Sequence, residues 1–260
     1  MSERKVYPSD VTDAEWSVLE TVLPPAKATG RPRKHTLREM VNAMFYLVRS
    51  GCPWRYLPDG FPPWQTVYSL FRAWERDGVW EQINTRLTQQ VRTRAGRDAQ
   101  ASAGIIGSQS VKTTRKRGAR GYDGGKKVNG RKRHIVVDTA GHMLKVVVHP
   151  ANVQDRDGAW EVFGAMAGHF PRLKLVWADQ GYTGDLEDLC EFAYGWRLEI
   201  VKRAAQPGFI LLPRRWVVER TFAWISTFRR LSRDFEQLAT VSEAWIYTAM
   251  SRLLLRRLAI

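Results

Sequence analysis

The stretch SAGIIGSQSVKTTRKRG, Ser102–Gly118, joins an apolar run to a dense burst of positive charge. Ile105 and Ile106 form the apolar run, which stops at Gly107, and polar residues follow before the cations begin. This order predicts a strand that delivers a catalytic carboxylate to a phosphate backbone. No acidic residue stands in the stretch, however, so the chemistry that the layout predicts lacks its first group.

The segments after this stretch predict a layered α/β (α+β) domain over residues 105–260. Residues 131–139 and 142–150 have strand-like sequences separated by Ala140 and Gly141, which is typical of a hairpin. The run LKLVWADQG predicts a strand buried on both faces and ending at Asp179. Helical patterns over 155–170, 185–195, 214–235 and 241–260 alternate with the later strands, which predicts a mixed sheet flanked by helices.

The first 95 residues predict a small all-helical domain that is helix-turn-helix-like. Thr12 with Glu15, and Thr36 with Glu39, have the spacing of capping boxes. Several short helices in so few residues are typical of DNA-binding bundles, although many bundles bind no DNA. Small and polar residues over 96–104 predict the linker to the second domain.

Composition favours a nucleic-acid partner. The chain has 260 residues, a net charge of +15 and a pI near 10.2, which is typical of proteins that bind nucleic acid; a ribosomal or membrane-surface protein is the alternative. Cys52 and Cys190 form neither a metal-binding spacing nor a disulfide framework. No signal peptide or membrane span is evident, so we expect a cytoplasmic, nucleoid-associated protein without a membrane partner.

Two acids stand where phosphate chemistry would use them. Asp179 ends a buried strand, where open sheets place their ligands, and Glu219 lies one helical turn from Arg215. Two divalent ions acting on phosphate need carboxylates that converge from different elements. An ordinary surface aspartate and a helical Glu–Arg pair would show the same spacing, so both interpretations stay open at this point.

Five motifs in order resemble a known family: SQSVKTT, GYDGGKKVNGRKRHIVVDTAG, ANVQDRDGA, WADQGYTG and RRWVVERTFAWISTFRRLSRDFE. Together with residues 30–74 they are similar to DDE-type insertion-sequence transposases of the insertion-sequence-five family. The resemblance implies a ribonuclease H-like fold, two Mg²⁺ or Mn²⁺ ions, and strand cleavage and transfer on double-stranded DNA, at transposon terminal inverted repeats and target DNA. It further implies a homodimer or a higher assembly on DNA.

The same resemblance makes Asp179 the second acid and Glu219 the third, both metal ligands, and Arg215 a DNA contact. The first acid should stand where this chain has Gly107. We expect an aspartate introduced there to face solvent and metal. No other acid replaces it: pairing of Gly107 near His134 would leave Asp138 about 13 Å away, and cations surround Asp123 in its loop. The hypothesis is a transposase with impaired catalysis; the alternative is a non-catalytic DNA-binding protein or repressor derived from one.

Cationic residues follow the predicted active-site strand and line the Glu219 helix. Runs of this kind contact phosphates without reading sequence, although many only solubilise a protein. The predicted DNA contacts are Arg31, Arg33, Lys112, Arg115, Lys116, Arg117, Lys126, Lys127, Arg131, Lys132, Arg215 and Arg220. The segment with Arg31 and Arg33 is either a minor-groove arm or a solvated linker.

Two further features have alternative interpretations. The face of the last helix with Ile246, Met250, Leu253 and Leu254 is either a dimer contact or core. A hydrolase built on Ser108 is disfavoured, because the residue two positions on, where a nucleophile elbow needs glycine, is a serine.

Overall fold

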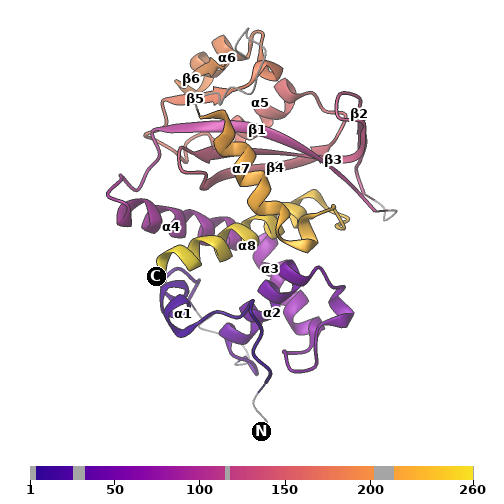
Figure 1. Cartoon of the computed structure of the whole chain (residues 1–260). Helices are drawn as coiled ribbons and strands as arrows, with labels where there is room; N and C mark the ends of the chain where they lie inside the picture. Colours follow the sequence, from indigo (N-terminus) through magenta and orange to yellow (C-terminus); the bar gives the residue numbers. More distant parts are fainter. Residues whose placement is uncertain (1–3, 26–32, 115–117, 202–213, 260) are drawn as a thin grey trace.

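In the part of the chain that the structure describes, six strands form one mixed sheet with helices on both faces (Figure 1). The structure is a computed structural model and describes residues 4–25, 33–114, 118–201 and 214–259. The strands are β1 (Ala103–Lys112), β2 (Gly121–Asp123), β3 (Val128–Asp138), β4 (Met143–Pro150), β5 (Leu175–Ala178) and β6 (Arg197–Ile200). Their order is β2-β3-β1-β5-β6, with β4 also paired to β3. The short strand β2 was not predicted.

The sheet has the mixed pairing of a ribonuclease H-like fold, which confirms the expected fold class. β1 runs antiparallel to β3 and parallel to β5, and β5 runs parallel to β6. The predicted hairpin is β3–β4, and Gly141 takes a φ of 86° in its turn. One register prediction was wrong by a residue, since Gly107 pairs with Ile135 and Asp138 pairs with Gly104. Asp138 still lies three residues along the strand from the partner of Gly107, about 10 Å.

Successive side chains of each strand point to opposite faces of the sheet, and this divides the interior into two apolar cores. Ile105, Ile135, Val137 and Trp177 belong to one apolar cluster, together with the helices on their side of the sheet. Ile106, Val136, Val176 and Ala178 belong to the other, together with α5 (Asp155–Met166) and α6 (Leu186–Tyr194). Odd-numbered positions of β1 thus face one helical layer and even-numbered positions face the other, which decides where each neighbour of Gly107 points.

The first helical layer combines both ends of the chain. It contains α1 (Asp13–Glu20), α2 (Leu37–Ser50), α3 (Trp64–Arg76), α4 (Val79–Arg94), α7 (Arg215–Ser226) and α8 (Ala239–Leu258). The helix α8 lies between the sheet and the first three helices (Figure 1), and its Ile246, Met250 and Leu254 are at most 1% exposed. Of the two interpretations of this face, core packing is therefore the correct one, because these side chains lie in the interior of their own chain. The domain division at residues 96–104 stays a prediction, since one apolar cluster runs from the N-terminal helices to the sheet.

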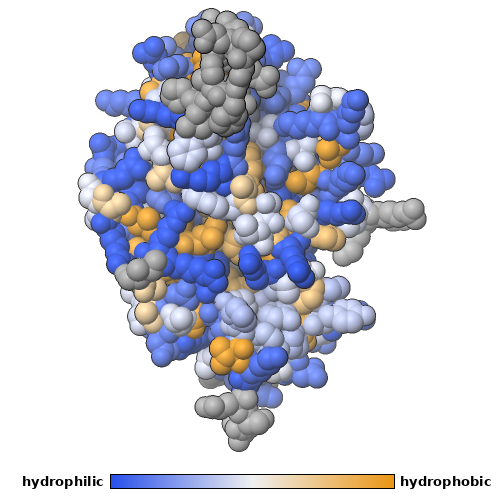
Figure 2. Space-filling view, viewed as in Figure 1, coloured by the Kyte–Doolittle hydropathy of each residue, from blue (hydrophilic) through white to orange (hydrophobic). Residues whose placement is uncertain are grey.

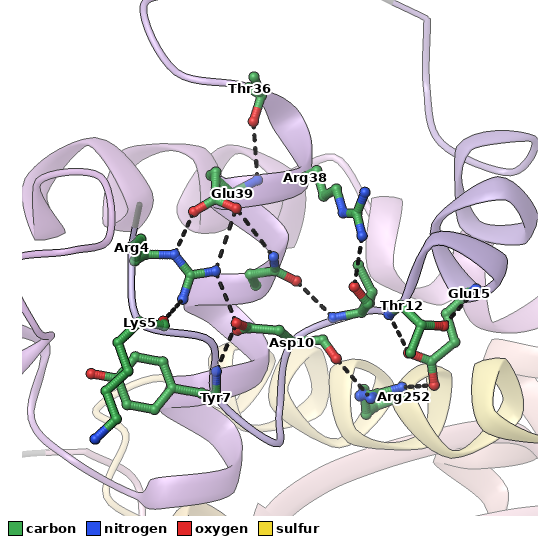
Figure 3. Close-up of polar contacts among 12 residues, drawn as sticks. Arg4, Lys5, Tyr7, Asp10, Thr12, Glu15, Thr36, Arg38, Glu39 and Arg252 are labelled. Carbon is green, nitrogen blue, oxygen red and sulfur yellow. Dashed lines mark hydrogen bonds and ion pairs between the residues drawn. The ribbon is translucent and has the colours of Figure 1, made fainter. Parts of the chain in front are cut away.

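Polar contacts tie the N-terminal segment to α2 and α8 (Figure 3). The predicted capping box of Thr12 and Glu15 is present, and the same Glu15 forms a buried ion pair with Arg252 of α8. Arg4 pairs with Asp10 and Glu39. Thr36 caps α2, but Glu39 binds Arg4 instead of closing the second predicted box. These bonds hold the N-terminal segment and α1 against α2 and α8.

The helix α7 is shorter than predicted. It ends at Ser226, after which Phe228 is buried and a 3-10 turn, η3 (Arg229–Leu231), continues the chain. Arg230 in this turn is buried over the ring of Trp245, 4.6 Å from its centroid. The helical pattern extended through residue 235 because these buried residues continue the apolar spacing without continuing the helix.

Side chains of α8 cover the open edge of β4. The carboxylate of Glu243 accepts a hydrogen bond from the backbone N–H of Val148 at 2.8 Å, and the Tyr247 hydroxyl accepts one from Val146 at 3.3 Å. An uncovered edge would leave these donors available to another chain. Burial raises the pKa of Glu243 to about 7, against the opposing effect of the Val148 hydrogen bond.

We expect Glu243→Gln to stabilise the protein at pH 8 and to change its stability little near pH 4. The carboxyl pKa is higher in the fold than in the unfolded chain, so its contribution to stability falls as pH rises from about 4.3 to 7. An amide keeps the acceptor for Val148 and never ionises. The gain at pH 8 should approach roughly 3 kcal/mol at most, measured by urea denaturation at both pH values. Glu187→Gln on the exposed face of α6 is the control; an equal gain in both variants would contradict the assignment.

Candidate active site

β1 and β5 bring the position of the missing acid level with Asp179. The two strands pair in parallel, with Gly104 opposite Val176 and Ile105 opposite Trp177. Two further steps of this register place Gly107 level with Asp179, which follows the last residue of β5. Adjacent parallel strands thus set the first two acid positions side by side, as the resemblance implies.

The helix α7 crosses one face of the sheet (Figure 1), and the β3–β4 turn holds it there. Thr221 donates to the carbonyl of Gly141 at 3.0 Å, and Arg220 donates to that of Ala140 at 2.8 Å. A side chain at Gly141 would meet Thr221 and Trp224, so glycine allows the close approach. The guanidinium of Arg220 also lies between Trp216 and Trp224, 4.5 and 4.7 Å from their ring centroids. Both tryptophans therefore hold an arginine of their own helix.

Gly107 lies beneath α7 and is buried. A Cβ built on Gly107 would come within 2.9 Å of both methyl groups of Val218, the residue before Glu219. The expectation that position 107 faces solvent was wrong, because it faces the apolar side of α7. Glu219 itself is exposed. The helix that carries Glu219 therefore packs directly over position 107 through Val218.

Asp179 shapes the chain that follows β5. Its carboxylate accepts the N–H of Gly181 at 2.9 Å and caps the 3-10 turn η2 (Gln180–Tyr182). Only one of its oxygens takes this bond. The buried hydroxyl of Tyr182 has no hydrogen-bond partner among the residues that the structure describes, and burial, with Asp155 and Asp179 nearby, raises its pKa well above the usual value.

Asp155 is a neighbour of the site that sequence reasoning missed. It is the first residue of α5, on the face of the sheet opposite Gly107, and accepts hydrogen bonds from Ser108 at 3.0 Å and Lys132 at 2.9 Å. A Cβ on Gly181 would lie 3.0 Å from an Asp179 oxygen and 3.3 Å from an Asp155 oxygen, so the two carboxylates are near one another. Its position inside ANVQDRDGA, one of the quoted motifs, was the available signal.

Cations hold the Asp155 carboxylate in place. Burial alone would raise the pKa of Asp155, yet the close contact with His134 and the hydrogen bond from Lys132 outweigh burial and hold it well below its usual range. His134 stacks on His149, and burial lowers the pKa of His149 to about 4. A carboxylate already paired with a buried lysine is a poor substitute for a metal-binding acid, so Asp155 does not replace residue 107.

Asp123 and Asp138, the other possible substitutes for the first acid, are also held by partners of their own. Asp123 lies on β2, is 8% exposed, and accepts from Ser110 and from the backbone of Lys126. Asp138 is fully buried and paired with Arg92. Asp123 therefore lies on a strand, where its partners hold it, and not in the loop that was predicted.

Burial removes two of the predicted DNA contacts. Arg131 and Lys132 are 2% and 5% exposed, and they pair with Asp234 and Asp155. Both predictions were wrong, because strand alternation and distant carboxylates turn these cations inward. Arg33, Lys112, Lys126 and Lys127 are exposed, and Arg220 is partly exposed. Arg31, Arg115, Lys116 and Arg117, and the side chain of Arg215, lie outside the described residues.

The acidic donors do not form a complete metal centre. Among the residues that the structure describes, no group of three or more His, Cys, Asp and Glu side chains converges in a way that could hold a metal ion. Asp179 and Glu219 supply two carboxylates, and Gly107 supplies none where a third would stand. A site with two ions bound by three acids therefore does not fit this set of residues.

Comparison with known proteins gives two family matches and one curated relative. Residues 11–84 match the family described as "Putative transposase of IS4/5 family", and residues 98–254 match "Transposase DDE domain". A Burkholderia cepacia protein named "Putative transposase for insertion sequence element IS402" is 36% identical over 124 residues, covering 45% of this chain. The match spans 59% of that relative's length, less than two thirds. No solved structure matches the chain.

Proposed function

Because the chain belongs to the transposases of the IS4/5 family with a DDE domain, we propose that it binds the terminal inverted repeats of an insertion sequence. Its catalytic fold is built for strand cleavage and transfer on double-stranded DNA. What supports this most is the packing of β1, β5 and α7: Gly107 stands level with Asp179 in the register of the paired strands, and Val218, which precedes Glu219, lies against Gly107. Gly107, Asp179 and Glu219 are the three acid positions of the family resemblance.

Catalysis by this chain is impaired. A DDE domain implies dependence on a divalent metal, and Mg²⁺ or Mn²⁺ prefers carboxylate oxygens that converge from several elements. This chain has two such residues, Asp179 and Glu219. At the position of the first acid it has Gly107, which lies under Val218. The neighbouring acids Asp155 and Asp123 are held by lysines and serines.

A non-catalytic DNA-binding protein, such as a repressor derived from a transposase, is the second candidate. Gly107 favours it, because the substitution removes a metal ligand and leaves the fold intact. The two candidates share DNA binding and differ only in cleavage. An assay of strand cleavage therefore separates them.

Exposed cations beside the site form the proposed DNA surface. Lys112 lies on β1, and Lys126 and Lys127 lie in the β2–β3 turn. The ammonium of Lys126 lies 2.9 Å from the hydroxyl of Ser108, the residue after Gly107, on the opposite face of the sheet from Gly107. Figure 2 shows a largely hydrophilic surface on this side of the molecule, with hydrophobic residues interspersed across its middle. Within the described ranges, every helix is too short or too polar to cross a lipid bilayer.

We expect DNA binding without metal, with an affinity that falls steeply as salt rises, because cations on DNA release counterions. Lys126→Gln/Lys127→Gln should reduce the slope of log affinity against log salt by roughly 2, about one per phosphate contact. Lys174→Gln is the matched control, since this exposed lysine precedes β5 at the far end of that strand. Electrophoretic mobility shifts over a salt series measure both. A flat salt response of the unchanged chain would contradict the proposal.

A further inference from the structure

The two helices on one face of the sheet carry a charge opposite to that of the whole chain. Residues 155–195 contain eight acidic and three basic residues, although the chain has a net charge of +15. Six of these acids are exposed on or beside α5 and α6: Asp157, Glu161, Asp185, Glu187, Asp188 and Glu191. Such a surface repels the phosphate backbone, so it is not part of the DNA-binding surface.

Large apolar side chains stand among these acids. Trp160 is 40% exposed, Leu189 is 47% exposed and Phe192 is 92% exposed. Trp160 and Leu189 line a cleft of about 480 Å³ between α5 and α6. Exposed apolar side chains that lie together and are rimmed by charged residues are typical of protein interaction sites. We call this surface, residues 155–161 and 185–192, the acidic face.

Charge decides which kind of partner fits. A two-fold contact between two acidic faces would set like charges against each other, which is unfavourable. The partner must therefore present a basic surface with an apolar centre. The chain has such a surface at its other end, where Met40, Pro63 and Leu70 line a hollow of about 480 Å³ together with Arg33, Lys34 and His35. We call it the basic hollow.

We propose that the acidic face of one copy docks in the basic hollow of a second copy, with Phe192 entering the hollow. The two surfaces lie at opposite ends of the molecule, α6 at one end and α2 and α3 toward the other (Figure 1). Their contact is therefore head-to-tail, and it forms either a closed ring or an open chain. Arg33 on the rim contacts the partner in this arrangement and is withdrawn from DNA in the docked copy.

Sedimentation velocity without DNA tests the contact. The unchanged chain should associate as its concentration rises, and added salt should weaken the association because the charges are exposed. Phe192→Ser should weaken it roughly tenfold or more, as expected for a central aromatic anchor. Tyr122→Ser, at a tyrosine that is 56% exposed on β2, is the control and should associate like the unchanged chain.

Charge reversal distinguishes this contact from any other self-association. One variant reverses the acidic face (Glu187→Lys/Glu191→Lys) and another reverses the hollow (Arg33→Glu/Lys34→Glu). Each alone should stay monomeric, because like charges then meet, whereas their mixture should associate, because each reversed surface meets its opposite. A monomeric unchanged chain, or a mixture no better than its components, overturns the proposal. Salt-dependent DNA binding by Phe192→Ser would show that the proposed function stands even then.

Discussion

The Gly107→Asp variant should cleave DNA that carries insertion-sequence ends, with Mg²⁺ present, about a thousandfold faster than the chain as it stands. This factor corresponds to about 4 kcal/mol of transition-state stabilisation. The added carboxylate completes the set formed with Asp179 and Glu219, which two-metal phosphoryl transfer needs as converging ligands. End-labelled DNA on a denaturing gel measures the rate.

Val218 is the structural obstacle to this rescue. A Cβ at residue 107 would lie 2.9 Å from both of its methyl groups, and a β-branched side chain has little freedom to turn away. The helix α7 must therefore move by a few tenths of an ångström. The double variant Gly107→Asp/Val218→Ala removes the two methyl groups at a cost of about 2 kcal/mol in folding stability. We expect it to cleave at least as fast as the single variant.

Control variants distinguish the effect of the added carboxylate at residue 107 from the effect of changed packing around Val218. Val218→Ala alone and Gly107→Ala should both stay inactive, and Asp179→Ala or Glu219→Ala should abolish the rescued cleavage. Asp155→Asn in the rescued protein should leave cleavage within a few fold. Rapid cleavage by the unchanged chain that disappears with Asp155→Asn would mean that Asp155 serves in place of residue 107. Rescue variants that fold and bind DNA yet remain inert would place the defect elsewhere.

Local sequence signals predicted most elements correctly. Thr12 with Glu15 predicted the start of α1, Thr36 predicted the start of α2, and Ala140-Gly141 predicted the β3–β4 turn. Each of these depends on residues within a few positions of one another. The strand order followed from the resemblance, because pairing of β1 with β5 joins segments about seventy residues apart.

Long-range packing accounts for the errors. Arg131 has the sequence neighbours of a solvated cation, but its partner Asp234 is 103 residues away. Gly107 was expected at an open site, yet the side chain that covers it comes from α7. Asp155 becomes part of the site only because α5 begins beside Ser108. Hydrophobic period and charge spacing contain no information about such contacts.

Asp138→Ala should destabilise the protein by about 3–5 kcal/mol, as expected when one partner of a buried ion pair is removed. Asp138 is fully buried at the end of β3 and pairs with Arg92 of α4, whose side chain is 5% exposed. The same carboxylate accepts the N–H groups of Ala140 and His142 in the turn that holds α7. Alanine would leave a buried guanidinium and two turn donors without their acceptor. Urea denaturation gives the difference.

The pH dependence of this loss follows from the carboxyl pKa. Burial alone would raise the pKa of Asp138, but hydrogen bonds from His142 and Arg92 outweigh burial and hold it well below the usual range. The stabilisation is therefore present above about pH 4 and disappears as pH falls further, so the two proteins should converge in acid. Asp77→Ala, which breaks an exposed pair with Arg76, is the control and should cost less than about 1 kcal/mol.

A double substitution tests whether Asp138 is needed for the hydrogen bonds it accepts or only to neutralise the charge of Arg92. Arg92→Met/Asp138→Leu replaces both charges with apolar groups of similar size, which is often neutral for a buried pair. Here we expect it to recover part of the loss and no more, because leucine cannot accept the N–H groups of Ala140 and His142. The hairpin turn should then loosen beneath Thr221 and Arg220, which bond to its carbonyls. Full recovery of stability would show that the turn needs no acceptor and that Asp138 acts only by neutralising Arg92.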